Sequence, residues 1–433
     1  MSLARPLPPS AGPKTLAEWL AHTEQLHAQT IDMGLARVSQ VRDAMTLHPP
    51  FPIITVAGTN GKGSTCTLLA ACLSAAGYRV GVYSSPHLVR YNERVRVGSD
   101  FASDQSLCDA FAKVEAARGD QSLTPFEFGT LAAMQVFIEA SLDVVILEVG
   151  LGGRLDAVNI FDPDCAIVTS IAIDHEAWLG NTREAIGFEK AGVFRRNRPA
   201  ICADPDPPAS IAAVAEALGA HLLQIDRDFS YQVHAEEWSF TLGERTWSGL
   251  PRLKLSGAFQ LRNASAALAA LMSLEARLPV SAEALREGLQ SASLAGRFQK
   301  ISEAPQVIMD VAHNPHAAAE LAANLRTEPC QGKTWAVFGM LSDKDIAGVI
   351  AALDPLVDCW CVSGIAEHRG ASLEEMLARL SGVRGRVSGF ASPEAAYQDA
   401  RLYAQETDRI VVFGSFITVG AVMGYLESVA PKT

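Results

Sequence analysis

A glycine-rich stretch near residue 60 carries the residue types that proteins use to hold phosphate groups. It consists of Gly58, Thr59, Asn60, Gly61, Lys62, Gly63 and Ser64. Glycine tolerates the backbone angles that turn successive N–H groups toward one anion, and the Lys62 ammonium adds positive charge there. The hydroxyl of Ser64 or Thr65 suits a Mg²⁺ ion that accompanies the phosphates. The stretch therefore predicts a loop that binds the phosphates of a nucleotide.

The spacing departs from the usual phosphate loop, which has four residues between its first glycine and Gly-Lys, and a hydroxyl directly after the lysine. Here two residues separate Gly58 from Gly61, and Gly63 follows Lys62. A glycine turn that only caps a helix is therefore an alternative. We favour the phosphate loop, because an exposed lysine between two glycines has little structural use.

The segments around the loop predict an α/β domain with a mostly parallel sheet. Residues 64–76 are almost wholly apolar or small and end at Gly77, which is typical of a buried helix. Strand, glycine loop and helix in this order place an anion at a helix N-terminus, where the helix dipole favours it. Four apolar runs are typical of buried strands, namely residues 51–56, 79–83, 143–149 and 166–173.

Polar side chains follow three of these strands where each strand ends. They are Ser85, Glu148 and His175. Because parallel strands present their carboxyl ends at one edge of a sheet, we expect these side chains to converge with the loop. A hydroxyl, a carboxylate and an imidazole suit a divalent cation, with ATP phosphates and water in the remaining positions. For His175 alone, an imidazole bonded only to the backbone is an equal alternative.

A second α/β alternation begins after residue 296, so we place a domain boundary between residues 296 and 297. Residues 1–296 then form one domain, which includes a small antiparallel sheet over 229–248, and residues 297–433 form a smaller one. The strands predicted in the smaller domain are 306–310, 334–339, 358–363, a short one near 386 and 409–414. Its helices are 315–326, 345–353, 373–380, 393–405 and a last helix.

Composition limits the class of protein. The 433 residues are 48% hydrophobic and 19% charged, as in soluble globular enzymes of two or three domains, and no apolar run is long enough to cross a bilayer. The start of the chain lacks the apolar core of a signal peptide. A net charge of -12 argues against a nucleic-acid partner. Eight scattered cysteines, four of them in apolar patterns, indicate reduced thiols and a cytoplasmic location.

Eight ordered motifs together resemble one family. They are IDMGLARV at 31, VAGTNGKGST at 56, SSPHL at 84, LEVGLGGRLDAVN at 147, TSIAIDHEAWLG at 169, EKAG at 189, GRFQ at 296 and DVAHNPHA at 310. The sequence closely resembles the bifunctional dihydrofolate synthase/folylpolyglutamate synthase family of the Mur ligase superfamily over nearly the whole chain. The resemblance accounts for the unusual loop, because GTNGKGS is the form that the family uses. It implies a P-loop-type ATPase domain and a smaller, Rossmann-like glutamate-ligase domain.

The resemblance also implies a role for individual residues. Residues 58–64 would cradle the triphosphate of ATP, and Ser85, Glu148 and His175 would hold Mg²⁺, with two ions expected. Lys190 is similar to a lysine that becomes carbamylated in the superfamily, whereas its position beside Glu189 alone favours a solvated ion pair. Lys62, Lys190 and His313 are the residues implied for catalysis, with His313 near the incoming amino acid. The resemblance also implies that the nucleotide is held across the cleft between the domains by Asn263, Arg297 and Asp310.

The pterin-bearing substrate is implied to lie against three segments. The residues are Ile31, Asp32, Met33 and Gly34, then Thr124, Pro125, Phe126 and Glu127, and then Leu155, Asp156 and Ala157. The IDMGL segment is associated with forms of the enzyme that accept dihydropteroate as well as folates. For Asp32, capping of the following helix is the alternative, because Asp is a favoured N-cap residue.

The expected activity is an ATP-dependent amide ligation. L-glutamate would be added to dihydropteroate, which gives dihydrofolate, and to reduced folates, which gives folylpolyglutamates, in each case through an acyl phosphate. A monomer is expected from the family. Two alternatives are weighed against this activity. A Mur-type cell-wall ligase would need an N-terminal nucleotide-sugar domain and a GKT sequence, and a nucleotide-dependent switch would hydrolyse ATP without either co-substrate.

Overall fold

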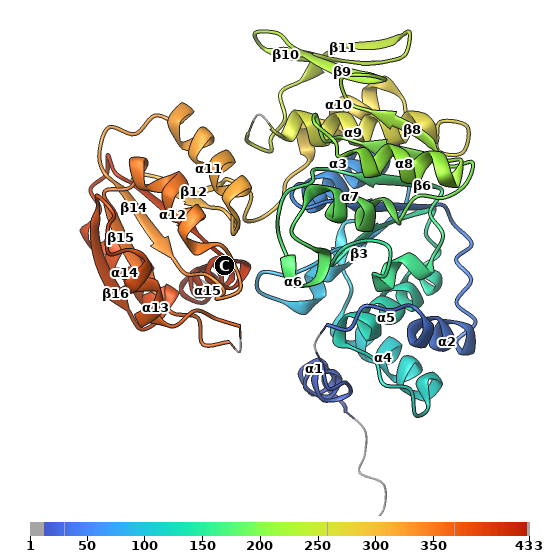
Figure 1. Cartoon of the computed structure of the whole chain (residues 1–433), viewed down its shortest axis with the longest axis horizontal. Coiled ribbons are helices and arrows are strands. Elements are labelled where there is room, and N and C mark those ends of the chain that lie inside the picture. The colour runs from blue at the N-terminus through green and yellow to red at the C-terminus, as the bar shows by residue number, and fades with distance from the viewer. Residues whose placement is uncertain (1–12, 30, 258, 368, 431–433) are drawn as a thin grey trace, which may run out of the picture.

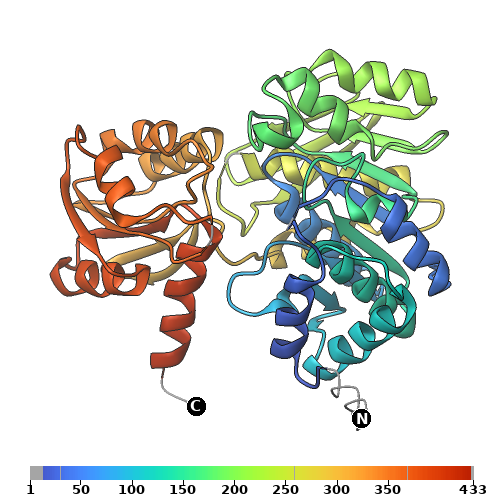
Figure 2. The ribbon, with the colours of Figure 1, turned by 60° about the horizontal axis from the view of Figure 1, so that its bottom comes forward.

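The computed structural model describes residues 13–29, 31–257, 259–367 and 369–430. Figure 1 shows two α/β bodies side by side, and the C-terminal one is coloured orange to red. Figure 2 shows the same arrangement from a second side. This mixed α/β architecture with parallel sheets confirms the predicted fold class. The expectation about a signal peptide concerns residues 1–12, which lie outside the described residues, and the domain boundary at residue 296 stays a prediction.

The larger sheet has the strand order β4-β3-β2-β5-β1-β6-β7-β8. Strands β2, β5, β1, β6, β7 and β8 pair in parallel in this order, and β3 and β4 add an antiparallel edge beside β2. The strands are β1 (Ile53–Ala57), β2 (Val80–Tyr83), β3 (Val95–Val97), β4 (Asp100–Phe101), β5 (Val144–Glu148), β6 (Cys165–Val168), β7 (Pro199–Cys202) and β8 (His221–Gln224).

Helices cover both faces of this sheet, because its central strands are apolar on both sides. Ile53 packs into one core and its neighbour Ile54 into the other. The first core uses helices α1 (Leu16–Gln25), α2 (Ala36–Ala44), α4 (Asp104–Arg118), α5 (Pro125–Glu139), α7 (Arg183–Ala191) and α8 (Ala209–Leu218). The second uses α3 (Lys62–Ala75), α9 (Phe259–Ser273) and α10 (Ala282–Ser291). Short helices α6 (Glu176–Leu179), η1 (Tyr91–Arg94) and η2 (Ala157–Ile160) lie in connections.

The small antiparallel sheet expected over residues 229–248 is present. Its order is β11-β10-β9, with β9 (Phe229–Val233), β10 (Glu237–Leu242) and β11 (Arg245–Pro251). Alternating aromatic and polar residues predict it correctly, since one face packs on the core and the other meets solvent. Trp238 and Phe240 fill the core side. Figure 1 places this sheet at the far end of the larger body.

The C-terminal body has the strand order β12-β13-β17-β14-β15-β16. Its strands are β12 (Gln299–Glu303), β13 (Gln306–Met309), β14 (Thr334–Phe338), β15 (Cys359–Ser363), β16 (Arg386–Phe390) and β17 (Arg409–Phe413). Its helices are α11 (Pro315–Thr327), α12 (Ile346–Leu353), η3 (Asp354–Leu356), α13 (Leu373–Arg379), α14 (Pro393–Tyr403) and α15 (Phe416–Val429). The alternation predicts these elements within a few residues, but it misses β12, an antiparallel edge strand with mostly exposed residues.

One predicted strand is too long. The apolar run of residues 166–173 predicts a strand to residue 173, but β6 ends at Val168. The next two residues leave the sheet because Thr169 and Ser170 both bind the carbonyl oxygen of Asn60, at 2.7 and 3.0 Å. The phosphate loop therefore sets where this strand ends.

Candidate functional site

The predicted phosphate loop joins β1 to the N-terminus of α3 and runs over the carboxyl end of the sheet. Gly58 and Gly61 have φ angles of 144° and 90°, a region that favours glycine. A Cβ atom on Gly58 would collide with the Thr169 hydroxyl, and one on Gly61 would lie 2.5 Å from Oδ1 of Asn263. Glycine is therefore required at both positions, and the assignment of this loop to phosphate binding stays a prediction.

Two lysine side chains meet at the start of the loop. Nζ of Lys62 donates to the carbonyl oxygens of Gly58 and Thr59, both at 3.2 Å. Nζ of Lys190, which reaches in from α7, donates to the same oxygen of Gly58 at 2.9 Å. Burial, helped by the charge of Lys62, lowers the pKa of Lys190 to about 7. The loop is therefore in contact with a buried amine whose pKa lies close to neutral pH.

The ion pair between Glu189 and Lys190, which position alone favours, is wrong. Glu189 accepts from Arg154 at 2.8 Å, and Lys190 is 3% exposed. Adjacent residues on a helix point about 100° apart, so Glu189 meets Arg154 while Lys190 faces the loop.

A chain of amide hydrogen bonds ties the loop to α9. The Gln260 amide donates to Oγ of Ser64 at 3.3 Å, and the amide of Asn263 donates to Oε1 of Gln260 at 2.9 Å. All three side chains are buried. The structure thus brings Asn263 to the loop, as expected. Sequence reasoning missed Gln260, although it lies one turn before Asn263 on the same helix.

The predicted metal residues are only partly gathered. Oε2 of Glu148 accepts the backbone N–H of Ser85 at 3.3 Å, and it would lie 3.7 Å from a Cβ on Gly63. Burial raises the pKa of the Glu148 carboxyl. His175 has a different contact, since its Nε2 lies 3.3 Å from Nζ of Lys344. Within the described ranges, no group of three or more His, Cys, Asp or Glu side chains could hold a metal by itself.

A polar cluster joins the two bodies beside the loop. Nζ of Lys344 donates to Oδ1 of Asp174 at 2.6 Å, and the Asn314 amide donates to Oδ2 of Asp174 at 3.1 Å. Burial alone would raise the pKa of Asp174, but His313 and Lys344 hold it well below its usual range. Burial and the charge of Lys344 lower the pKa of His175 to about 4, so this imidazole is neutral. Lys344 lies outside the motifs of the sequence analysis, whereas Asn314 lies in the motif at residue 310 but was given no role of its own.

The nucleotide residues predicted after α10 lie at the edge of the second body. The guanidinium of Arg297 would lie 3.8 Å from a Cβ on Gly63, and it stacks 5.0 Å from the ring centroid of Phe416. Asp310 accepts the backbone N–H groups of Phe298 and Ala312 at 2.9 and 2.8 Å. Asp310 therefore fixes the segment around Arg297 as the chain enters the second body.

His313 follows Asp310 and faces the first body. Its Nδ1 lies 2.9 Å from the carbonyl oxygen of Val311, and its Nε2 lies 3.7 Å from Oδ2 of Asp174. Asn60 of the phosphate loop exchanges amide hydrogen bonds with Asn314 at 3.3 and 3.1 Å. The motif at residue 310 thus faces the phosphate loop across the boundary between the bodies.

Arg37 links two of the three predicted pterin segments. It donates to Oδ2 of Asp32 at 2.5 Å and, through Nε, to Oε2 of Glu127 at 3.0 Å. Glu127 also closes a capping box with Thr124 at the start of α5, where Pro125 occupies the first turn. The N-cap of α2 is Leu35, so the alternative that Asp32 caps this helix is wrong.

The residues just before the third pterin segment pack against the other two segments through glycines. The ring of Phe126 packs on Gly150, where an added Cβ would lie 2.7 Å from it, and the Met33 methyl would lie 3.2 Å from a Cβ on Gly152. Asp156 accepts from the backbone of Leu151 and caps η2, and burial raises its pKa to about 6. The remaining predicted residues are the partly buried Ile31, Gly34 and Leu155 and the buried Ala157.

Comparisons with known proteins identify the family of the chain. Residues 56–271 match the Mur ligase middle domain, and residues 296–416 match the Mur ligase glutamate ligase domain. The chain is 49% identical over 422 residues to the dihydrofolate synthase/folylpolyglutamate synthase of Escherichia coli (strain K12), with 97% of each chain covered.

Solved structures give the same result. The chain is similar to E. coli FolC in complex with DHPP and ADP, with a TM-score of 0.92, 48% identity, and 96% of this chain and 99% of that chain covered. It is also similar to a bifunctional folylpolyglutamate synthase/dihydrofolate synthase with Mn, AMPPNP and L-glutamate bound, with a TM-score of 0.90, 51% identity, and 96% and 100% covered. The chain therefore belongs to the dihydrofolate synthase/folylpolyglutamate synthase family of Mur ligases.

Proposed function

We propose that this chain uses ATP to activate the carboxylate of dihydropteroate or of a reduced folate and joins it to the amine of L-glutamate at the boundary between its two bodies. Membership of the family makes it an ATP-dependent folate ligase with both activities. The observation that carries the proposed location is that the phosphate loop meets the second body directly, through Asn60 and Asn314. Relatives at this level of identity give no support to a cell-wall ligase or a nucleotide switch.

The reaction needs an activation step, because a carboxylate at neutral pH resists attack by an amine. Transfer of the γ-phosphoryl group to the carboxylate gives an acyl phosphate, the amine of glutamate attacks its carbonyl carbon, and phosphate leaves. The ammonium of Lys62 and the N–H groups of the loop offset the charge on the transferring group, a kind of electrostatic stabilisation commonly worth several kcal/mol. Contact between the bodies orients the amine and excludes the water that would hydrolyse the intermediate.

The residues around Glu148 fit a divalent cation. Its buried carboxylate has one backbone hydrogen bond and no bonded cation in the described structure, and His175 is neutral, the form that binds metals. Divalent metal and ATP use are features of the family. We assign Mg²⁺, in two ions, to Ser85, Glu148 and His175 with phosphate oxygens. When bound, Mg²⁺ would neutralise phosphate charge.

We propose that the side chain of Lys190 becomes carbamylated. An amine takes up CO₂ only in its neutral form, and a pKa of about 7 leaves half of the Lys190 side chains neutral near pH 7. The buried position and the hydrogen bond to Gly58 keep the group beside the loop. The carbamate would replace a positive charge near Lys62 by a negative one.

The pterin site that we assign lies where the three segments meet at Arg37, Gly150 and Gly152. Asp32 offers a carboxylate to the amino and ring N–H groups of a pterin, and Phe126 offers a ring face. The substrates are small molecules. We propose that the chain is a monomer in the cytoplasm with no nucleic-acid or membrane partner. None of the described helices is long and apolar enough to cross a membrane.

One assay tests the function. Purified protein is incubated with ATP, Mg²⁺ and L-glutamate, with either dihydropteroate or a reduced folate, and the products are resolved by mass. Phosphate release that requires both an acid substrate and glutamate is the expected result. Hydrolysis of ATP at the same rate without either one would contradict ligation.

A further inference from the structure

A cavity of about 440 Å³ lies away from the phosphate loop, between the side of α3, the turns that flank β2 and β3, and the segment that follows α10. Its volume is within the range of small-molecule sites. The residues that line it are Thr67, Ala70, Ala71, Ser74, Gly77, Tyr78, Arg79, Arg96, Gly98, Ser99, Ser291, Ala292 and Ser293. Apart from Tyr78, they are arginines, hydroxyl residues and small residues.

The charged residues that line this cavity are all positive. Arg79 and Arg96 line it, and no aspartate or glutamate is among its lining residues in the described chain. Asp143 accepts the backbone N–H of Arg79 at 2.7 Å and Asp100 accepts the hydroxyl of Ser99 at 3.3 Å, and within the described residues neither carboxylate pairs with a guanidinium of the cavity. The cavity therefore presents donors without a matching acceptor.

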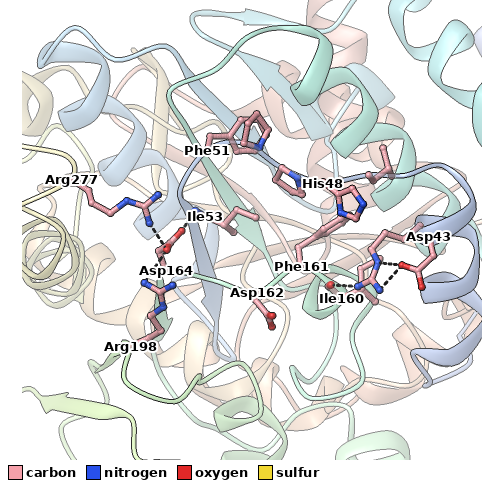
Figure 3. A pocket seen from close by; sticks show the side chains of 14 residues that line it. Asp43, His48, Phe51, Ile53, Ile160, Phe161, Asp162, Asp164, Arg198 and Arg277 are labelled. Atoms are coloured by element: carbon pink, nitrogen blue, oxygen red, sulfur yellow. Dashed lines mark hydrogen bonds and ion pairs between the residues drawn. The ribbon is translucent and has the colours of Figure 1, made fainter.

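A second cavity, of about 540 Å³, shows the contrasting case (Figure 3). Its arginines are each paired with a carboxylate. Arg198 and Arg277 both contact Asp164, at 3.2 and 2.5 Å, and Arg42 contacts Asp43 at 2.7 Å. The two cavities therefore differ in whether their arginines are paired with an acid.

Arg96 is the unusual member of the smaller cavity. Its Nε is buried and has no hydrogen-bond partner, and within the described residues the side chain makes no ion pair or hydrogen bond. Burial lowers the pKa of its guanidinium. A partly buried cation without a counter-charge is costly, whereas one that meets an oxyanion gains short, charge-assisted hydrogen bonds.

We propose that the cavity between α3, β3 and residues 291–293 binds a phosphate group, held by Arg96 and Arg79 with a hydroxyl group from Ser74 or Ser293. A guanidinium fork matches the spacing of phosphate oxygens, and hydroxyls donate to the oxygens that remain. The site is separate from the nucleotide loop, and it rests on no part of the proposed reaction.

The site borders the connection between the two bodies. Residues 291–293 lead directly to Leu294, whose side chain would lie 3.4 Å from a Cβ on Gly63, and then to Arg297. A phosphate group bound here is held partly by this connection. Occupancy therefore stabilises the segment that carries Arg297 to the loop.

The test measures the melting temperature while inorganic phosphate is titrated in, with chloride at matched ionic strength as the reference. Wild-type protein should show a saturable rise of about 2 °C when phosphate reaches roughly ten times its Kd. Lys62→Ala disables the nucleotide loop and should keep the rise. Arg96→Gln should melt at the same or a higher temperature without phosphate, because it removes an unpaired cation, and it should lose the rise.

Two further variants keep the test decisive if Arg96→Gln does not fold. Arg79 is exposed, so Arg79→Gln should fold normally and weaken phosphate binding severalfold. Arg277→Gln, a matched change in the larger cavity, should leave the phosphate response unchanged. Loss of the rise in Lys62→Ala with retention in Arg96→Gln and Arg79→Gln would put the anion at the loop and overturn the proposal. An equal rise with chloride, or no saturable rise, would overturn it as well.

Discussion

The Nζ atom of Lys190 lies 2.9 Å from the carbonyl oxygen of Gly58, so a buried amine from α7 touches the first residue of the phosphate loop. Helix α7 lies more than a hundred residues farther along the chain. Burial keeps the pKa of this amine near 7 instead of its ordinary value near 10. Through this contact, protonation or carbamylation of Lys190 directly affects the phosphate loop.

Lys190→Ala should lower kcat by about a hundredfold, since it removes a preorganised charge beside the loop. If the working form is the carbamate, a small carboxylic acid such as formate should restore part of the activity of this variant. Wild-type enzyme stripped of CO₂ should regain activity with bicarbonate, more fully at pH 8 than at pH 6. The sign follows because the amine is protonated below its pKa of about 7 and then cannot take up CO₂. Full activity without CO₂ at either pH would contradict carbamylation.

Lys62→Ala should lower kcat by on the order of a hundredfold or more and leave the melting temperature nearly unchanged. Among the described residues, the Nζ of Lys62 has two loop carbonyls as its hydrogen-bond partners, so its loss removes charge from the loop and little packing. Lys62→Arg keeps the charge and should retain more activity than the alanine variant. Unchanged turnover in Lys62→Ala would remove this residue from the mechanism.

Glu148→Gln and His175→Ala should each raise the Mg²⁺ concentration needed for half-maximal activity by about tenfold or more, as losses around metal sites commonly do. Folate binding measured without ATP should change little. Ser170→Ala, a change at the loop contact outside the metal residues, serves as the control for general damage. A lower folate affinity with an unchanged Mg²⁺ requirement would place both residues in the substrate pocket.

Asp32→Ala should lower kcat/KM for dihydropteroate much more than for a reduced folate that carries glutamate. The two acids present their carboxylates at different distances from the pterin ring, so one ring position cannot serve both reactions, and we assign Asp32 to the first. Because Asp32 also holds Arg37, the control is Arg37→Gln, which breaks the same bridge and keeps the carboxylate. Equal losses for both substrates with a lower melting temperature would mean that Asp32 only supports the fold.

Stability should fall with rising pH because of Glu320. Burial raises the pKa of this carboxyl to about 7, although Arg262 of the other body lies 3.0 Å away. An unfolded glutamate titrates near 4.3, so between about pH 4.5 and 7 the folded protein binds more protons, and stability is lost as pH rises through this range. Glu320→Gln should flatten the melting temperature across this range. Glu406→Gln, at an exposed position, should leave its slope unchanged.

Local spacing was enough to predict the phosphate loop. Glycines at fixed offsets and a lysine between them follow a short apolar strand, and each of these signals lies within about fifteen residues. The order of strands and helices in the C-terminal body could also be predicted from the sequence, because buried parallel strands are continuous apolar runs. The edge strand β12 was missed because edge residues carry no such run.

Contacts between distant segments could not be predicted from the spacing of residues along the chain. Position alone paired Lys190 with Glu189, whereas the fold turns Lys190 to Gly58 and pairs Glu189 with Arg154. Gln260 and Lys344 gave no signal, since a single polar residue in a helix or loop is most often solvated. Asp32 suited an N-cap by type, but the helix begins three residues later and Arg37 takes its carboxylate.

The sequence by itself determined the fold class, the loop and the family, because periodicity and glycine spacing act through local backbone geometry. The tertiary structure alone decided which charges meet, since burial and distance set the energy of a charged group. It placed Lys190 and Lys62 on one carbonyl, joined Asp174 to Lys344 across the two bodies, and left Arg96 without an acid. These partners come from segments far apart in the chain, and only packing brings them within a few ångströms of each other.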